Sequence, residues 1–293
     1  MTAITARRAT RADSAAPMHR DGSSSDPELI DRYGGRIRRL ALRLCSDAND
    51  ADDLVQETFL QAHRKWSQFE GRSDPGTWLY TIAIRIWRRK FLRRRTRARR
   101  PAMLSSLMPW AEATIADLRH GANEGLDRQL ADEAQAALRR AIAQMPPSFR
   151  LPLVLKDILE LSLEDVGAVL DLKPQTVKTR VHRARLMLRK ALVRGAPQRP
   201  APAPVYERQL CLDLLAAKLD AMDHGRRFPV TREVVCERCL AVFAELDLTA
   251  RVCASIDRGK LPPALRRALV TNTVSARSAG AAGREPRRTR SGS

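Results

Sequence analysis

The chain has 293 residues, with 53 Lys and Arg against 33 Asp and Glu, and a formal net charge of +20 at pH 7. This excess of cations indicates a polyanionic partner. No apolar run approaches the ~20 residues that a membrane span needs, and the polar N-terminus lacks the apolar core of a secretory signal. We therefore expect a cytoplasmic protein with no membrane partner.

An all-α fold is expected, because Ala, Leu, Arg and Glu dominate and aromatic residues are only 4% of the chain. Helical order is expected to begin at Asp26-Pro27-Glu28, where an N-cap residue, a proline and an acid precede an apolar-periodic segment. Changes in composition then divide the chain. The predicted segments are a disordered tail (1–25), a helical unit (26–100), a linker (101–126), a second helical unit (127–194), a Pro-rich linker (195–205), a small helical unit with cysteines (206–270) and a basic disordered tail (271–293).

The second helical unit contains the most specific motif, a helix-turn-helix that begins at Leu161. Ser162 can cap a short helix, Asp171 occupies the tight turn, and Pro174 opens a second helix. That helix is apolar on one face and basic on the other, with no acid before Leu192. A cationic second helix of this kind is typical of DNA-reading proteins. A solvated basic face on an ordinary bundle helix is the alternative.

The N-terminal part of this second helix is expected to reach base edges, and two arginines further along are expected to contact phosphates. The candidates for base reading are Gln175, Thr176, Lys178, Thr179 and His182. The candidates for phosphate contact are Arg183 and Arg185.

Residues 146–190, PPSFRLPLVLKDILELSLEDVGAVLDLKPQTVKTRVHRARLMLRK, resemble region 4 of bacterial extracytoplasmic-function (ECF) sigma factors of the sigma-70 family. Residues 50–95, DADDLVQETFLQAHRKWSQFEGRSDPGTWLYTIAIRIWRRKFLRRR, are similar to region 2 of the same family. The two segments occur in the expected order, which is more specific than either alone. The resemblance implies a transcription initiation factor, not an enzyme, whose partners are core RNA polymerase and promoter DNA.

In this family, region 2 docks on the β′ clamp helices of the polymerase and opens the -10 element, while region 4 binds the -35 element and the β flap. The resemblance implies that Asp53, Gln56 and Glu57 face the polymerase. It also implies a -10 reading loop that captures a flipped base, with cations nearby. The implied -10 contacts are Phe69, Gly71, Arg72, Ser73, Trp78, Arg85, Arg88 and Arg89. Arg85 stands where the family often has Asn, and ordinary packing is the alternative role for Trp78.

The unit 206–270 lies beyond the usual end of the family and contains four of the five cysteines. Cys236 and Cys239 have the C-x2-C spacing with which two thiolates chelate one metal ion at a helix start. The segment resembles a zinc-binding anti-sigma domain, in which Cys211 matches the upstream ligand, although Arg232 stands where that pattern has His. Buried free cysteines are the alternative.

The second resemblance implies a Zn²⁺ site with Cys211, Cys236 and Cys239 as three of its four ligands, which His224 or Cys253 would have to complete. Soft thiolate ligands would also suit copper, as Cu(I). The sigma units themselves require no cofactor. We expect the C-terminal unit to regulate the sigma units in cis through metal or thiol chemistry. A separate anti-sigma factor is a further candidate partner.

Two other function classes remain open. A helix-turn-helix regulator that acts without polymerase would carry a ligand-binding or dimerisation domain in place of the 26–100 unit, whereas the DLVQETF and GTWL segments resemble a polymerase-binding module. An enzyme acting on nucleic acid would need a catalytic motif, and the chain has no phosphate-cradling glycine loop, no HExxH and no GxSxG.

Overall fold

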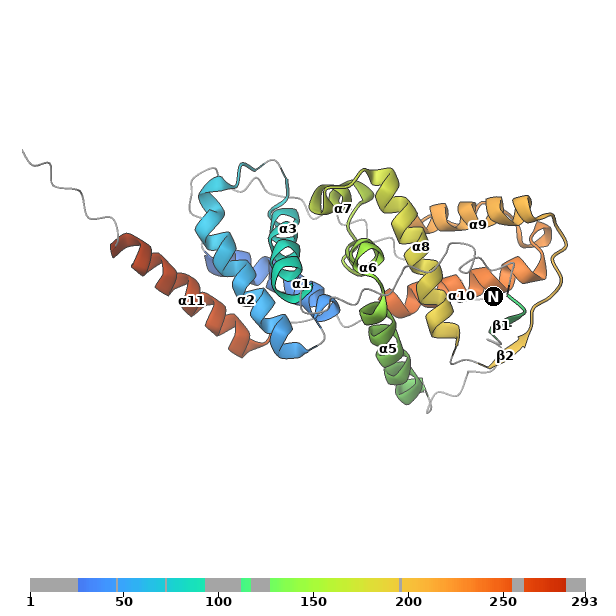
Figure 1. Ribbon diagram of the computed structural model, residues 1–293, viewed down its shortest axis with the longest axis horizontal. Coiled ribbons are helices and arrows are strands. Elements are labelled where there is room, and N and C mark those ends of the chain that lie inside the picture. The colour runs from blue at the N-terminus through green and yellow to red at the C-terminus, as the bar shows by residue number, and fades with distance from the viewer. Residues whose placement is uncertain are drawn as a thin grey trace, which may run out of the picture.

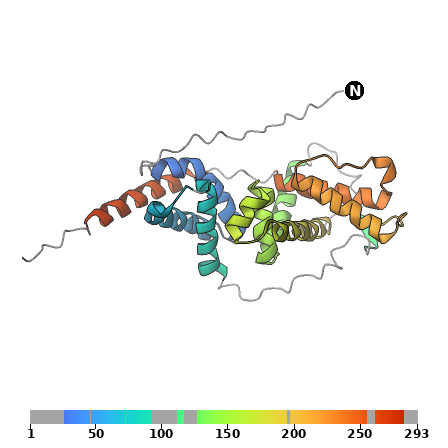
Figure 2. The same cartoon turned by 90° about the horizontal axis from the view of Figure 1, so that it is seen from above.

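The computed structural model describes residues 26–45, 47–71, 73–92, 112–116, 127–194, 197–254 and 261–282. Apart from one two-stranded ribbon, the regular structure in these residues is helical, which confirms the all-α prediction. Figures 1 and 2 show three groups of helices in a row along the long axis: α1 to α3 with α11, then α5 to α8, then α9 and α10. None of the described helices has the length and apolar character needed to cross a membrane.

The first group is a three-helix bundle with short extensions. Its elements are α1 (Asp26–Leu44), α2 (Ala48–Lys65), the 3-10 turn η1 (Trp66–Gln68), α3 (Pro75–Trp87) and the π-helical turn η2 (Arg88–Leu92). Asp47 caps α2 by accepting the backbone N–H groups of Asn49 and Asp50. Asp74 caps α3 by accepting the Gly76 N–H at 2.7 Å. The apolar stripes of the three helices face one another and form a buried core.

The second group contains the helix-turn-helix. Its elements are α5 (Asp127–Gln144), α6 (Pro147–Leu153), the π-helical turn η5 (Val154–Ile158), α7 (Leu163–Leu170) and α8 (Pro174–Val193). Ser162 caps α7 by accepting the Asp165 N–H at 2.9 Å. Asp171 adopts the left-handed conformation, with φ of 57°. Gly167 permits the tight turn, because a Cβ atom there would lie 2.7 Å from the carbonyl oxygen of Leu172. The predicted helix-turn-helix is therefore confirmed.

The first two groups share one core. The Trp87 Nε1–H donates to the Leu44 carbonyl at 3.1 Å, and Arg150 of α6 donates to the same carbonyl from Nη1 at 3.3 Å. The Arg150 guanidinium also lies 5.6 Å from the centroid of the Trp87 ring. These contacts fix the end of α1 against α6.

The C-terminal part forms α9 (Arg208–Asp223), the short turn η6 (Arg232–Val234), α10 (Glu237–Ala254) and α11 (Pro263–Ala282). Helices α9 and α10 enclose a second apolar core. Helix α11 crosses back to the first bundle, where it packs against α1 and α2 (Figure 1).

The predicted boundary at residue 270 is wrong, because residues 271–282 continue α11. Leu265, Leu269 and Thr273 are buried at four-residue spacing, so the packed face of α11 extends past the predicted end. Arg266 adds a two-pronged ion pair with Asp31 of α1, at 2.5 and 2.7 Å.

Both predicted linkers contain ordered structure. Strand β1 (Thr114–Ala116) pairs antiparallel with β2 (Gln198–Pro200), with Ile115 opposite Arg199. Ile115 is 1% exposed, so the ribbon buries an apolar side chain. The two linkers are thereby tied to each other and to α10, since the Ala116 N–H donates to Glu245 at 2.7 Å.

Candidate nucleic-acid interface

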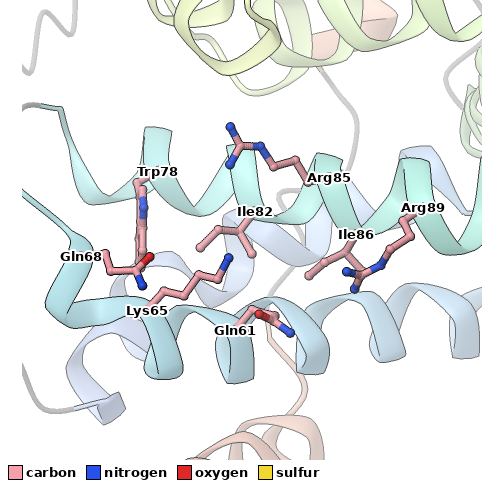
Figure 3. Close-up of a pocket in the computed structure, with 8 residues that line it drawn as sticks. All are labelled: Gln61, Lys65, Gln68, Trp78, Ile82, Arg85, Ile86 and Arg89. Atoms are coloured by element: carbon pink, nitrogen blue, oxygen red, sulfur yellow. The ribbon is translucent and has the colours of Figure 1, made fainter.

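A pocket opens between α2 and α3 in the first bundle (Figure 3). It is lined by Gln61, Lys65, Gln68, Trp78, Ile82, Arg85, Ile86 and Arg89. Figure 3 shows the Ile82 and Ile86 side chains of α3 pointing toward α2, with the Trp78 ring at one end of this row and Arg89 at the other. An apolar and aromatic wall with cations beside it can hold an unstacked base and its backbone phosphates.

Three aromatic rings pack together beside this pocket. The Trp66 and Phe69 centroids are 5.2 Å apart and stacked, and the Phe69 and Trp78 centroids are 5.3 Å apart. Trp66 and Trp78 meet edge to face at 5.7 Å. Trp78 therefore packs in a cluster and also lines the pocket, so its two alternative roles are compatible.

The structure brings some of the predicted -10 residues to the pocket and leaves others outside. Trp78, Arg85 and Arg89 line it. Gly71, Ser73 and Arg88 are exposed, and Gly71 has a φ of 68° that favours glycine. Arg72 lies outside the described residues.

Sequence reasoning missed Gln61, Lys65 and Gln68, which line the pocket from α2 and η1. A signal was present, because Gln61 and Lys65 are four residues apart and lie on the polar side of α2, away from its apolar stripe.

The predicted polymerase-facing residues lie on α2. Asp53 is exposed, whereas Gln56 and Glu57 are half-buried. The Glu57 carboxylate pairs with Lys90 at 3.0 Å and with Arg89 at 3.7 Å. The hydrogen bond from Lys90 holds the pKa of Glu57 below its ordinary value. Glu57 thus links α2 to Arg89 and Lys90 of η2.

One flank of α8 borders an open groove. The groove is lined by Ser148, Phe149, Gln175, Thr176, Thr179, Arg180 and Arg183. It therefore gathers Gln175, Thr176 and Thr179 of the predicted base-reading set, together with the predicted phosphate contact Arg183. Arg180 and the start of α6 belong to the same surface although they were not among the predicted contacts.

The opposite flank of α8 meets acids from the C-terminal part. Lys178 Nζ lies 2.5 Å from Asp220 Oδ1, and His182 Nε2 lies 2.6 Å from Asp223 Oδ2. Arg185 donates from Nη1 to Asp223 at 2.6 Å. Burial raises the pKa of Asp223, but hydrogen bonds and charges from His182 and Arg185 together outweigh this effect. The pKa of Asp223 therefore lies below its ordinary value.

Arg185 does not fit its predicted role as a phosphate contact in this structure. It is 3% exposed and also forms a two-pronged pair with Asp157, at 2.7 and 2.9 Å. Arg189, one turn further on, is 0% exposed and pairs with Glu245 and Glu112. The physical reason is that acids from η5, α9, α10 and the segment before β1 surround this end of α8.

Three of the predicted metal ligands come together. The Sγ atoms of Cys211, Cys236 and Cys239 all lie within 4.8 Å of one another, and the three residues are buried. Burial raises the pKa of the Cys236 thiol, but hydrogen bonds from Cys239 and nearby backbone groups outweigh this and lower it. The pKa of Cys239 is raised, chiefly by burial. A low-pKa thiol beside two others suits a soft metal ion.

The predicted fourth ligands lie elsewhere. His224 follows the C-terminal end of α9, where its Nδ1 is 2.8 Å from the Asp220 carbonyl oxygen. Cys253 is buried in the core shared with the first two groups, and burial raises its pKa to about 12. Among the described residues, the cluster therefore supplies three ligands, one fewer than a closed structural zinc site uses.

Comparisons with known proteins bear on both the α2–α3 pocket and the helix-turn-helix. A family model described as Sigma-70 region 2 matches residues 29–98, and one described as Sigma-70, region 4 matches residues 135–188. The RNA polymerase sigma-H factor of Pseudomonas aeruginosa is 34% identical over 165 residues, which cover 56% of this chain and 84% of that protein. The ECF RNA polymerase sigma factor SigW of Bacillus subtilis is 31% identical over 168 residues, 56% of this chain and 87% of that protein.

The chain belongs to the ECF RNA polymerase sigma factors. As a sigma factor, it acts in the initiation of transcription. The ECF sigma factor SigE of Mycolicibacterium smegmatis is also 34% identical, but the match spans only 63% of the length of that relative and 58% of this chain.

Solved structures similar to this sigma factor include the sigma factor RpoE in complex with the anti-sigma factor NepR from Bartonella quintana, at 26% identity and a TM-score of 0.39, covering 56% of this chain and 94% of that one. Another is CnrH in complex with the cytosolic domain of CnrY, at 21% identity and a TM-score of 0.41, covering 58% and 89%. The two family models cover the pocket between α2 and α3 and the helix-turn-helix as far as Leu188. They do not cover α9 to α11.

Proposed function

We propose that this sigma factor binds core RNA polymerase and directs it to promoters, with the α2–α3 pocket at the -10 element and α8 at the -35 element. The observation that carries the proposal is the pocket itself. It places an aromatic ring, two isoleucines and the cations Lys65, Arg85 and Arg89 together in the part of the chain that matches region 2. A regulator that binds only duplex DNA has no use for such a pocket, since a base enters one only after unstacking.

The polymerase contacts in this proposal are those that the resemblance to region 2 implies. Asp53 is exposed on α2, and Gln56 and Glu57 are half-buried next to it. We assign this surface of α2 to the β′ clamp helices and the helix-turn-helix unit to the β flap. Melting the duplex costs free energy. Docking on the polymerase must therefore hold the pocket next to the DNA strand while the duplex opens.

Run-off transcription with core polymerase tests this function, using a promoter selected from a fragment library by the wild-type chain. A Lys65→Ala/Arg85→Ala variant removes two cations of the pocket. We expect it to lower open-complex formation by about tenfold, or ~1.4 kcal/mol, because the two cations would attract the backbone phosphates of the opened strand. Arg64→Ala, which removes an exposed cation next to Lys65 that does not line the pocket, is the matched control and should leave initiation nearly unchanged.

Two results would contradict the proposal. The first is a chain that binds duplex DNA but never supports initiation by core polymerase, which favours a regulator that works without polymerase. The second is a decrease in open-complex formation that is equally large in Lys65→Ala/Arg85→Ala and in the control Arg64→Ala.

We also propose that the C-terminal part regulates the sigma factor in cis, with Cys211, Cys236 and Cys239 holding Zn²⁺ or Cu(I). The cysteine cluster supports this assignment, because thiolates are preferred ligands of both ions. Cys211 lies in the first turn of α9 and Cys239 in the first turn of α10, so a bound ion would join the starts of these two helices. A fourth ligand would come from outside the cluster.

Metal analysis of the purified full chain tests the site. We expect about one ion per chain, lost in Cys236→Ser/Cys239→Ser and kept in Cys45→Ser, which changes a cysteine outside the cluster. The assignment is overturned if the wild-type chain retains no metal and the double variant initiates transcription as the wild type does under reducing, oxidising and metal-loaded conditions.

A further inference from the structure

A stripe of basic residues on α8 is matched by acids along its length. Lys178, His182, Arg185 and Arg189 recur at spacings of four, three and four residues, so they lie on one side of the helix. Each of them is paired with a carboxylate at 2.7 Å or closer. Hydrogen bonds to an ionised carboxylate are charge-assisted, which makes them about twice as strong as bonds between neutral groups.

The two acids nearest the N-terminal half of α8 come from one place, the C-terminal end of α9. Asp220 pairs with Lys178, and Asp223 pairs with both His182 and Arg185. The Asp223 side chain is 0% exposed, so it is enclosed between the two helices. Lys178 and His182 are also two of the residues expected to reach DNA. The carboxylates of α9 thus occupy positions that acceptor atoms of DNA, on base edges or phosphates, would take.

Helix α9 also obstructs the access of DNA to α8 sterically. The major groove of B-DNA is ~12 Å wide and admits one α-helix of about 10–12 Å diameter. The end of α9 lies directly against the N-terminal half of α8, which is the half that a recognition helix inserts. Helix α8 cannot enter the groove to its full depth while α9 stays there. The groove-lining flank with Gln175 and Thr179 remains open, but the opposite flank is covered.

We infer that α9 is an autoinhibitory cover of the recognition helix, held by Asp220 and Asp223 and displaced when α8 binds duplex DNA. The inference rests on the proposed function, in which α8 reads the -35 element, and it specifies how that surface is regulated. Release of α9 leaves region 4 intact, because Arg185 keeps its pair with Asp157 of η5. Lys178 and His182 then become available to DNA.

Binding of the full chain to a labelled mixed-sequence 30-bp duplex, followed by fluorescence anisotropy at increasing KCl, tests the cover. We expect Asp220→Asn/Asp223→Asn to bind about tenfold tighter than wild type at low salt. The slope of log K against log[salt] should become more negative by about one unit, because each freed cation that contacts a phosphate adds about −0.9 and the variant frees Lys178.

Asp213→Asn is the matched control, since Asp213 is an exposed acid of the same helix that pairs with Gln209 instead of α8. Its affinity should stay within about twofold of wild type, which corresponds to less than ~0.5 kcal/mol. Asp220→Asn alone, at a half-buried position, should shift affinity in the same direction by a smaller factor and guards against misfolding of the double variant.

Hydrogen exchange of the wild-type chain gives a second test that needs no substitution. Saturation with the same duplex should speed amide exchange across residues 208–223, since α9 leaves its packed position. The inference is overturned if the double variant and wild type bind the duplex with equal affinity and slope, or if α9 stays equally protected in the bound state. If no form of the chain binds the duplex at any salt concentration, the proposed DNA-reading role of α8 fails as well.

Discussion

Glu245 of α10 is the acid whose removal should destabilise the protein most sharply. It is 1% exposed and accepts hydrogen bonds from Arg189 at 2.5 Å and from the Ala116 backbone N–H at 2.7 Å. In Glu245→Met, Arg189 keeps only Glu112 as an acidic partner, and the Ala116 N–H loses its acceptor. Breaking a buried ion pair from one side costs ~3–5 kcal/mol, and because the pair with Glu112 remains, we expect a loss at the lower end of this range.

Urea unfolding of the full chain, followed by far-UV circular dichroism, measures this loss. Arg189→Met/Glu245→Met removes both charges and should recover part of the stability, leaving a cost of about 1–3 kcal/mol from the unpaired Ala116 N–H. The double-mutant cycle should therefore show a coupling of at least ~2 kcal/mol between the two residues. Asp247→Asn is the control, because it disrupts a more exposed ion pair, between Asp247 of α10 and Lys218 of α9. It should lower the free energy of unfolding by less than ~1 kcal/mol. A loss of under ~1 kcal/mol for Glu245→Met, or additive effects in the cycle, would refute the account of how α10 is docked on α8.

Gly167→Ala should lower the melting temperature, because overpacking against the Leu172 carbonyl costs ~1–3 kcal/mol and outweighs the helix propensity of alanine; a higher melting temperature would contradict this. The lowered pKa of Asp223 contributes stability that is fully present above its ordinary value of 3.8 and is lost as pH falls through the folded value. The acid-induced loss of stability below about pH 4 should accordingly be smaller in Asp223→Asn than in wild type, and identical pH profiles would count against the pairs on α8. Cys236, with its lowered pKa, should be alkylated by iodoacetamide at about pH 8 before Cys253, whose pKa is about 12, and mass spectrometry of the metal-free chain showing the reverse order would contradict the assignment.

Local signals predicted the helix-turn-helix well, because its turn and caps depend on neighbours in the sequence. Ser162 accepts the Asp165 N–H three residues on, and Asp171 has the left-handed backbone that its position required. The first bundle was predictable for the same reason, since its stripes and caps are local.

The ion pairs that the basic side chains of α8 form within the protein were not predictable, because their acidic partners are distant in the sequence. Arg185 pairs with acids 28 and 38 residues away, and Arg189 with acids 56 and 77 residues away. Helical spacing identifies the cationic side of a helix but cannot distinguish a side facing DNA from a side facing carboxylates. The same pattern serves both, and only the fold decides between them.

Two further differences have the same origin in long-range contacts. The end of α11 looks like a polar tail in the sequence, but Thr273 is buried there. The three-residue strands β1 and β2 are too short to show periodicity, and they form because they pair with each other across the fold. The cysteine cluster was predicted from a resemblance and not from spacing alone, and the two suggested fourth ligands lie elsewhere because α9 holds His224 at its far end and the shared core holds Cys253.

In the proposed function, this chain gives core RNA polymerase the ability to start at particular promoters. The most direct measurement is transcription in vitro from fragmented bacterial genomic DNA with core polymerase alone and with core polymerase plus the full chain, followed by mapping of RNA 5′ ends. We expect discrete new start sites that share two upstream sequence elements, with more product from Asp220→Asn/Asp223→Asn than from wild type. Start sites that are the same with and without the chain, for wild type and for this variant, would contradict it.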